Sequence, residues 1–98
     1  MQMEQLQASE HLVSTYRHLV ETGLMDLATG NVSCRVEGGM LISCSGATAQ
    51  NLTPDRVVFV REDGTWVGDI KPSSEWRMHS AVYKNSDKAN AVIHAHSA

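Results

Sequence analysis

The sequence predicts a small α/β domain in which an N-terminal helix covers a largely antiparallel sheet. Residues 4–22 repeat apolar side chains at the three- and four-residue spacing of a helix face. After Gly30 the pattern changes to the two-residue alternation of strands, and it returns in short runs separated by turns. A second helical pattern, Trp76–Asn85, precedes a final apolar strand. These changes of period indicate helices packed in layers on a sheet.

The composition is that of a soluble globular domain. Of the 98 residues, 42% are hydrophobic and 19% are charged, which is too apolar for a disordered chain. The net charge of −3, without a Lys/Arg cluster, argues against nucleic acid or an anionic membrane surface as the main partner. No apolar run approaches the roughly 20 residues of a membrane-spanning helix. Two cysteines do not make a disulfide scaffold, so we expect a cytoplasmic protein.

The chain stops at Ala98, directly after a strand that carries two histidines. A domain rarely ends where its chemistry-bearing residues gather. We therefore expect residues 1–98 to be the N-terminal part of a single larger domain.

The helix predicted over residues 4–22 has one apolar face that suits the cover of a sheet, and Gly23 follows it as a stop. The apolar positions are Leu6, Leu12, Val13, Tyr16, Leu19 and Val20.

Residues 31–36 and 40–43 predict two strands of a hairpin around a Gly-Gly turn. Alternation places Val32, Cys34 and Val36 on one face, and Asn31, Ser33 and Arg35 on the other. We expect Cys34 to be a small core residue and Cys44, at the exit of the second strand, to be more exposed.

The second half of the chain predicts two more strands, the helix and the final strand. The strands 56–61 and Thr65–Val67 flank a tight turn. Ser73 or Ser74 is the expected N-cap of the helix Trp76–Asn85, with Glu75 in its first turn. The final strand is expected over 91–96.

His94 and His96 stand two residues apart in this final strand. Side chains at i and i+2 of a strand share a face, whereas on a helix they would lie about 200° apart. The pair can therefore offer two imidazole ligands to one divalent metal. Two hydrogen-bonded histidines at a strand end are an equally good interpretation of the pair alone.

Three short polar segments have the composition of an anion-binding site. Ser73-Ser74 offers hydroxyls and free N–H groups at a helix N-terminus, where the helix dipole favours phosphate or carboxylate. Gly30-Asn31 and Ser45-Gly46 add unobstructed N–H groups, an amide and a hydroxyl. Each pair alone is more often ordinary turn or cap chemistry, so the prediction requires that all three meet in space.

Glu75 is the carboxylate that a metal site with two histidines still needs. It can also serve as a general base toward a bound substrate. His79 lies four residues further on the same helix face and is either another ligand or, more often, a packed or substrate-side histidine.

Four segments together resemble the class II aldolase/adducin family, in the order and spacing of that family from about residue 10 onward. They are Thr29–Arg35, Leu41–Gly46, Lys71–His79 and His94–Ser97. The resemblance implies a layered α/β/α fold with a largely antiparallel central sheet, incomplete in this chain, and a homotetramer as the assembly.

The resemblance also implies the roles of the site residues. It implies that Glu75, His94 and His96 hold one Zn²⁺, with a further histidine ligand beyond Ala98. It places the substrate phosphate among the residues that match Gly30, Asn31, Ser45, Gly46, Ser73 and Ser74.

The implied reaction is the zinc-dependent cleavage of a phosphorylated ketose, such as L-fuculose 1-phosphate, to dihydroxyacetone phosphate and an aldehyde. Glu75 is the implied catalytic residue, which shuttles protons. Cys44 stands where relatives often have proline, and Ser45 stands where some have threonine, and both are expected to tune their loop.

Three other functions remain open within the resemblance. Sugar-phosphate epimerases of the family usually carry aspartate at the position of Glu75, so the glutamate favours an aldolase. A methylthioribulose-phosphate dehydratase keeps the glutamate and stays possible. A non-catalytic, adducin-like interaction domain is opposed by the intact Glu75, His94 and His96.

Overall fold

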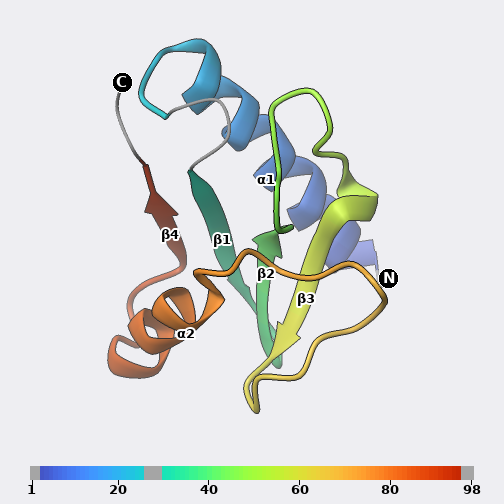
Figure 1. Ribbon diagram of the computed structural model, residues 1–98. Helices are drawn as coiled ribbons and strands as arrows, with labels where there is room; N and C mark the ends of the chain where they lie inside the picture. Colours follow the sequence, from blue (N-terminus) through green and yellow to red (C-terminus); the bar gives the residue numbers. More distant parts are fainter. Residues whose placement is uncertain (1–2, 26–29, 96–98) are drawn as a thin grey trace.

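The computed structural model of the protein describes residues 3–25 and 30–95 (Figure 1). Within these ranges it has two α-helices, a four-stranded sheet and a short 3-10 helix before the third strand. They are α1 (Met3–Glu21), β1 (Asn31–Val36), β2 (Gly39–Ser43), the 3-10 helix Pro54–Arg56, β3 (Val57–Arg61), α2 (Trp76–Asn85) and β4 (Ala91–His94).

The strands lie in the order β3-β2-β1-β4, and every neighbouring pair is antiparallel. β1 is therefore an inner strand, in which Ser33 lies opposite Ile42 of β2 and Val92 of β4. The predicted antiparallel sheet is confirmed.

The two helices cover opposite faces of the sheet, with α1 behind it and α2 in front in Figure 1. α1 buries Leu12, Val13 and Tyr16, as its apolar spacing predicts, whereas Leu6 is 43% exposed. α2 buries His79 and Tyr83. The expected α/β/α layering is confirmed. The helix α1 ends before Gly23, whose φ of +76° favours glycine.

Because both faces are covered, the polar side of β1 is buried as well as its apolar side. Ser33 is fully buried, and Asn31 is 4% exposed. A buried hydroxyl or amide without a partner costs about 1–3 kcal/mol, so these two side chains require hydrogen bonds from α2 or from neighbouring loops. The site described below contains those bonds.

Three local predictions are wrong. Thr65–Val67 is not a strand: Trp66 makes one isolated bridge to Val60, and the segment is exposed. The residue at the N-cap of α2 is Glu75 instead of Ser73 or Ser74. β4 ends at His94, and residue 96 lies outside the described residues.

Cys44 is buried rather than exposed, with 4% of its surface accessible. It forms an antiparallel bridge with Pro72, so the segment that leads to α2 covers it. Cys34 is half-buried, and both cysteines are free thiols. Burial raises the pKa of each thiol, which favours the inert, protonated form.

Candidate functional site

The three predicted anion-binding segments line one pocket of about 210 Å³. The pocket lies where β1 begins, where β2 ends and where the chain enters α2. Its described lining residues are Gly30, Asn31, Cys44, Ser45, Gly46, Ala47, Ser73, Ser74 and Glu75. All six residues predicted to bind phosphate are therefore brought together, and Glu75 stands beside them.

Antiparallel pairing explains why these segments meet. The start of β1 and the end of β2 lie at the same end of the hairpin, where the Ser43 hydroxyl accepts a hydrogen bond from the Val32 N–H at 3.2 Å. The segment before α2 runs along the end of β2. There, Ser73 N–H donates to Ser43 O, and Ser45 N–H donates to Lys71 O, both at 2.9 Å.

Two glycines shape the pocket wall. Gly46 has a φ of +71°, which lets the chain turn directly after Ser45. Gly30 is buried, and a Cβ at this position would overlap the side chain of Met25. A side chain at position 30 would therefore have to displace that of Met25.

The entry to α2 supplies polar groups from a short turn. Ser73 Oγ accepts a hydrogen bond from the Glu75 N–H at 3.2 Å, and Trp76 N–H donates to Ser73 O at 3.0 Å. This turn precedes the helix, which explains why Ser73 does not occupy the N-cap itself. Ser74 and Glu75 remain exposed at the pocket.

None of the described lining residues is Lys or Arg. Binding of an anion would therefore depend on backbone N–H groups, hydroxyls, the Asn31 amide and the positive end of the α2 dipole.

A buried network behind the pocket connects α2 to β1. His79 is fully buried, and its Nδ1 lies 2.6 Å from Ser33 Oγ, while its Nε2 is hydrogen-bonded to Asn31 Oδ1. Tyr83 Oη lies 2.7 Å from the same Ser33 oxygen. His79 is thus a packed histidine, because both of its ring nitrogens are hydrogen-bonded within the protein and neither is left to bind a metal.

Burial and, to a lesser extent, the nearby His94 together lower the pKa of His79 from 6.5 to about 4. Burial also raises the pKa of Tyr83, so both groups are neutral at neutral pH. Ser33 and Tyr83 were not predicted as site residues. Their only signals in the sequence are the i, i+2 spacing of Asn31 and Ser33 and the i, i+4 spacing of His79 and Tyr83.

The predicted metal ligands are described only in part. His94 is the register partner of Asn31, so its side chain lies on the α2 face of the sheet. Glu75 lines the pocket, and its backbone oxygen accepts a hydrogen bond from the His79 N–H at 3.3 Å. His96 lies outside the described residues. Over residues 3–25 and 30–95, no three His, Cys, Asp or Glu side chains form a metal-binding group.

The two candidate ligands that the structure describes, Glu75 and His94, nevertheless have side chains of the kinds that bind zinc. A carboxylate and an imidazole are ligands that Zn²⁺ takes in catalytic sites. His94 lies close enough to His79 to lower the pKa of its imidazole, and Glu75 stands at the start of the helix that carries His79.

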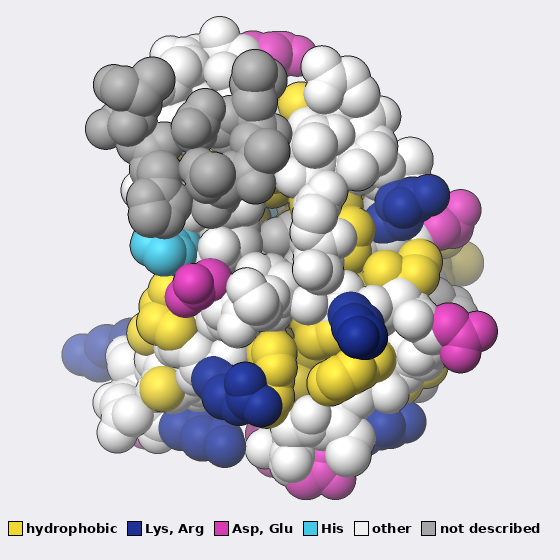
Figure 2. All heavy atoms as spheres, viewed as in Figure 1, with side chains coloured by type: hydrophobic (Ala, Val, Ile, Leu, Met, Phe, Trp, Pro, Cys, Tyr) yellow, Lys and Arg dark blue, Asp and Glu magenta, His cyan; other side chains and the backbone are white. Residues whose placement is uncertain are grey.

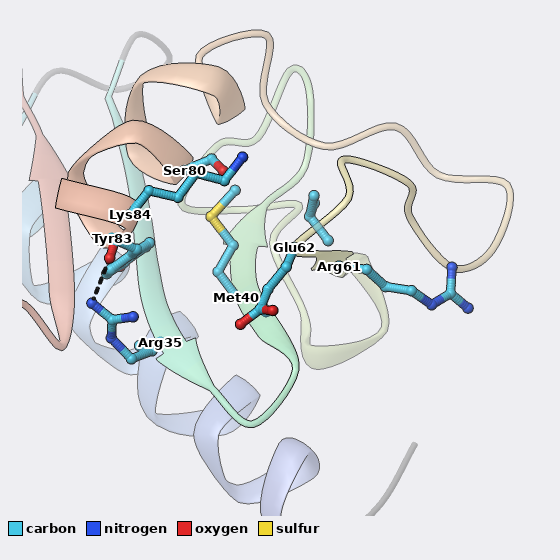
Figure 3. Close-up of a pocket in the computed structure, with 9 residues that line it drawn as sticks. Arg35, Met40, Arg61, Glu62, Ser80, Tyr83 and Lys84 are labelled. Atoms are coloured by element: carbon cyan, nitrogen blue, oxygen red, sulfur yellow. Dashed lines mark hydrogen bonds between the residues drawn. The ribbon is translucent and has the colours of Figure 1, made fainter. Parts of the chain in front are cut away.

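A second pocket, of about 270 Å³, lies beside the C-terminal half of α2 and contains none of the predicted site residues. Figure 3 shows Arg35 directed toward Tyr83 at this pocket and Arg61 extending away from it. Lys and Arg side chains on the face shown in Figure 2 are interspersed with hydrophobic and polar ones. Among the described helices, none is long and apolar enough to cross a membrane.

Comparison with known proteins links this fold to one family. The model of the class II aldolase and adducin N-terminal domain matches residues 10–98. The chain is 45% identical over 94 residues to a 5-methylthioribulose-1-phosphate/5-deoxyribulose-1-phosphate aldolase of Escherichia coli O45:K1, and 37% identical over 94 residues to an L-fuculose phosphate aldolase of Escherichia coli K12. Each match covers 96% of this chain and 44% of the relative.

A solved structure of an L-fuculose 1-phosphate aldolase superposes with a TM-score of 0.87 at 32% identity, over 99% of this chain and 46% of that one. The chain therefore spans less than half the length of the relatives that it matches.

Proposed function

The chain belongs to the class II aldolase and adducin family, and from this premise we propose that it forms the phosphate- and metal-binding part of a ketose-phosphate aldolase. The reaction would cleave a ketose 1-phosphate to dihydroxyacetone phosphate and an aldehyde. The observation that carries the proposal is the convergence of three polar segments and Glu75 on one pocket. We assign the activity to the natural gene product that contains this sequence.

In this proposal the pocket holds the substrate phosphate. Gly30, Gly46 and Ser74 offer N–H donors. Ser45, Ser73 and Ser74 offer hydroxyls, and Asn31 offers its amide. A phosphate accepts several such bonds, and each bond to a charged group is worth about 1.5–3 kcal/mol. Fixing the phosphate fixes the distance from it to the carbons that react.

Glu75, His94 and His96 would hold the divalent cation in this proposal. When bound, Zn²⁺ acts as a Lewis acid that polarises the substrate carbonyl and stabilises negative charge that develops beside it. Glu75 is exposed at the pocket, so its carboxylate is in a position to accept a proton from a substrate hydroxyl.

The names of the relatives suggest which substrates to test. L-fuculose phosphate and the two ribulose 1-phosphates named above are all sugar phosphates, and they differ in the part that would leave as the aldehyde. The higher identity to the second aldolase makes 5-methylthioribulose 1-phosphate the first substrate to assay and L-fuculose 1-phosphate the second.

The test is release of dihydroxyacetone phosphate by the purified gene product with Zn²⁺, measured by a coupled reduction. Asn31→Ala should raise KM roughly tenfold or more, because one donor to the phosphate is lost, with a smaller effect on kcat. Asn85→Ala, at the far end of α2, is the matched control and should leave both constants unchanged.

Absence of dihydroxyacetone phosphate with every substrate would reject the aldolase. An epimerised or dehydrated product in its place would identify another reaction of the family. Equal KM values for the wild type and Asn31→Ala would remove Asn31 from the phosphate site.

A further inference from the structure

We propose that Tyr83, Ser33 and His79 form a directional hydrogen-bond chain that fixes the orientation of the Asn31 amide, so that its NH₂ group faces the 210 Å³ pocket. His79 is then a positioning residue, which acts on the bound anion through Asn31. The inference rests on the proposed role of Asn31 in phosphate binding.

The contacts join two elements that are far apart in the sequence. Ser33 and Asn31 lie on one face of β1, and His79 and Tyr83 lie one turn apart on α2. Ser33 and His79 are fully buried, Asn31 is 4% exposed and Tyr83 is 7% exposed. Water therefore has little access to these side chains, and each must find its partner within the protein.

The chemistry of the partners determines which atom donates each proton. Asn31 Oδ1 can only accept, so His79 Nε2 must carry a hydrogen. The imidazole is buried without a carboxylate among its hydrogen-bond partners, which favours the neutral ring with a single N–H. Nδ1 is then an acceptor.

The remaining two hydroxyls follow in turn. The Ser33 O–H donates to His79 Nδ1 at 2.6 Å, which leaves the Ser33 oxygen to accept from Tyr83. The Tyr83 O–H donates to Ser33 Oγ at 2.7 Å. Every proton in the chain therefore points from Tyr83 toward Asn31.

The bond between His79 and Asn31 determines which group of the Asn31 amide faces the pocket. With Oδ1 held by His79, the amide can present only its NH₂ group to a ligand, and NH₂ is a donor to phosphate oxygens. If the amide were reversed, Oδ1 would face the anion, and the donor would be replaced by a repelling acceptor. Loss of the orientation should weaken phosphate binding by roughly 10- to 100-fold.

A purely structural network makes a different prediction. It would stabilise the packing of α2 on β1 without regard to the amide, so its loss would weaken anion binding whether or not Asn31 is present. A double-mutant cycle between positions 79 and 31 separates the two possibilities.

The experiment uses the 98-residue chain and inorganic phosphate as the probe, with binding followed by proton–nitrogen NMR. His79→Leu should weaken binding roughly 10- to 100-fold, and His79→Gln should restore it to within a few-fold, because the glutamine amide can donate to Asn31 and accept from Ser33. In the Asn31→Ala background, His79→Leu should have no further effect. Amide spectra establish that each variant is folded.

A second measurement needs no substitution. In the wild type, long-range proton–nitrogen spectra should show His79 as the Nε2–H tautomer, and addition of phosphate should shift the side-chain NH₂ signals of Asn31. An Nδ1–H tautomer, or equal losses from His79→Leu in both backgrounds, would overturn the orientation chain alone. Failure of the wild type to bind phosphate would overturn the proposed phosphate site, and the inference with it.

Discussion

Among the single residues, His79 combines complete burial with an imidazole that would titrate near neutral pH in water. Burial and the neighbouring His94 lower the pKa of its imidazole from 6.5 to about 4. The folded protein therefore holds His79 neutral in a range where the unfolded chain already binds a proton. The other titratable groups of this region are His94 and Tyr83, the latter connected through Ser33.

This difference predicts a loss of stability in mild acid. As pH falls from 6.5 to 4, the unfolded state gains a proton that folded His79 does not, so the free energy of unfolding should fall by up to about 3 kcal/mol. The contribution of His79 to the free energy of unfolding is fully present above the pKa of 6.5 that its imidazole has in the unfolded chain. Urea unfolding of the chain at a series of pH values, with a chelator present, measures the slope.

His79→Gln lacks the titrating ring, so its free energy of unfolding should change less between pH 6.5 and 4, even if the variant is less stable at every pH. The same slope in both proteins would show that another group is responsible.

The sequence predicted which polar segments line the pocket, but it did not predict the buried network behind them. The six phosphate-site candidates could be found because Gly, Ser and Asn mark anion-binding turns by local chemistry, and all six do line one pocket. Ser33 and Tyr83 could not be found in this way. Their partnership joins positions 50 residues apart and exists only because α2 packs on β1.

Among the elements, α2 is held at its C-terminal end by an arginine of β1, in addition to the buried network of Asn31, Ser33, His79 and Tyr83. Arg35 of β1 donates to Tyr83 O at 3.0 Å and Ser86 O at 2.6 Å at the C-terminal end of α2, and to Ala89 O at 2.9 Å beyond it. Its guanidinium also lies 4.9 Å from the centre of the Tyr83 ring. The first of these bonds is visible in Figure 3.

We expect Arg35→Lys to destabilise the chain by about 1–3 kcal/mol, because an ammonium cannot reach three carbonyls with the fork of a guanidinium. Hydrogen exchange should increase first in α2 and in the turn before β4. Arg61→Lys, on the exposed end of β3, is the control and should change stability by less than about 0.5 kcal/mol. Equal effects of Arg35→Lys and Arg61→Lys on stability would contradict the role of Arg35 in holding α2 to the sheet.

The helices and strands could be predicted where the spacing of their own apolar residues is enough to define them. Apolar spacing predicts the two helices and the four strands. The ends of these elements differ from the prediction where tertiary contacts determine them. Thr65–Val67 has the composition of a strand, but it makes only two backbone hydrogen bonds with β3, Arg61 N–H to Thr65 O and Val67 N–H to Phe59 O. Cys44 is buried because the segment around Pro72 returns over it, and local sequence does not contain that contact.

For the whole molecule, the sheet has β4 at one edge, paired only with β1. Ile93 of this strand is 49% exposed. An exposed apolar edge strand offers unpaired N–H and C=O groups to another chain, so association of the 98-residue chain at high concentration is expected.

We predict that the 98-residue chain alone binds Zn²⁺ weakly and does not cleave L-fuculose 1-phosphate measurably. Its described residues hold no group of three metal ligands, and within the described sheet β4 is an edge strand that receives orienting contacts from only one neighbouring strand, β1. Loss of such orienting contacts commonly reduces metal affinity about 10- to 100-fold. Calorimetric zinc titration and an assay for dihydroxyacetone phosphate test both parts.

Tight zinc binding with rapid turnover by this chain would contradict the prediction. Weak zinc binding without measurable turnover would agree with it.

The pairing of Asn31 with His94 across β1 and β4 limits how the chain length between α2 and β4 can vary. An inserted residue in the connection 86–90 that displaced β4 by one position would turn the imidazole of His94 to the α1 face. Inserting two would restore the face but move His94 along the strand by about 7 Å. Related sequences that keep the same site should therefore show insertions and deletions in other loops, and a constant number of residues here.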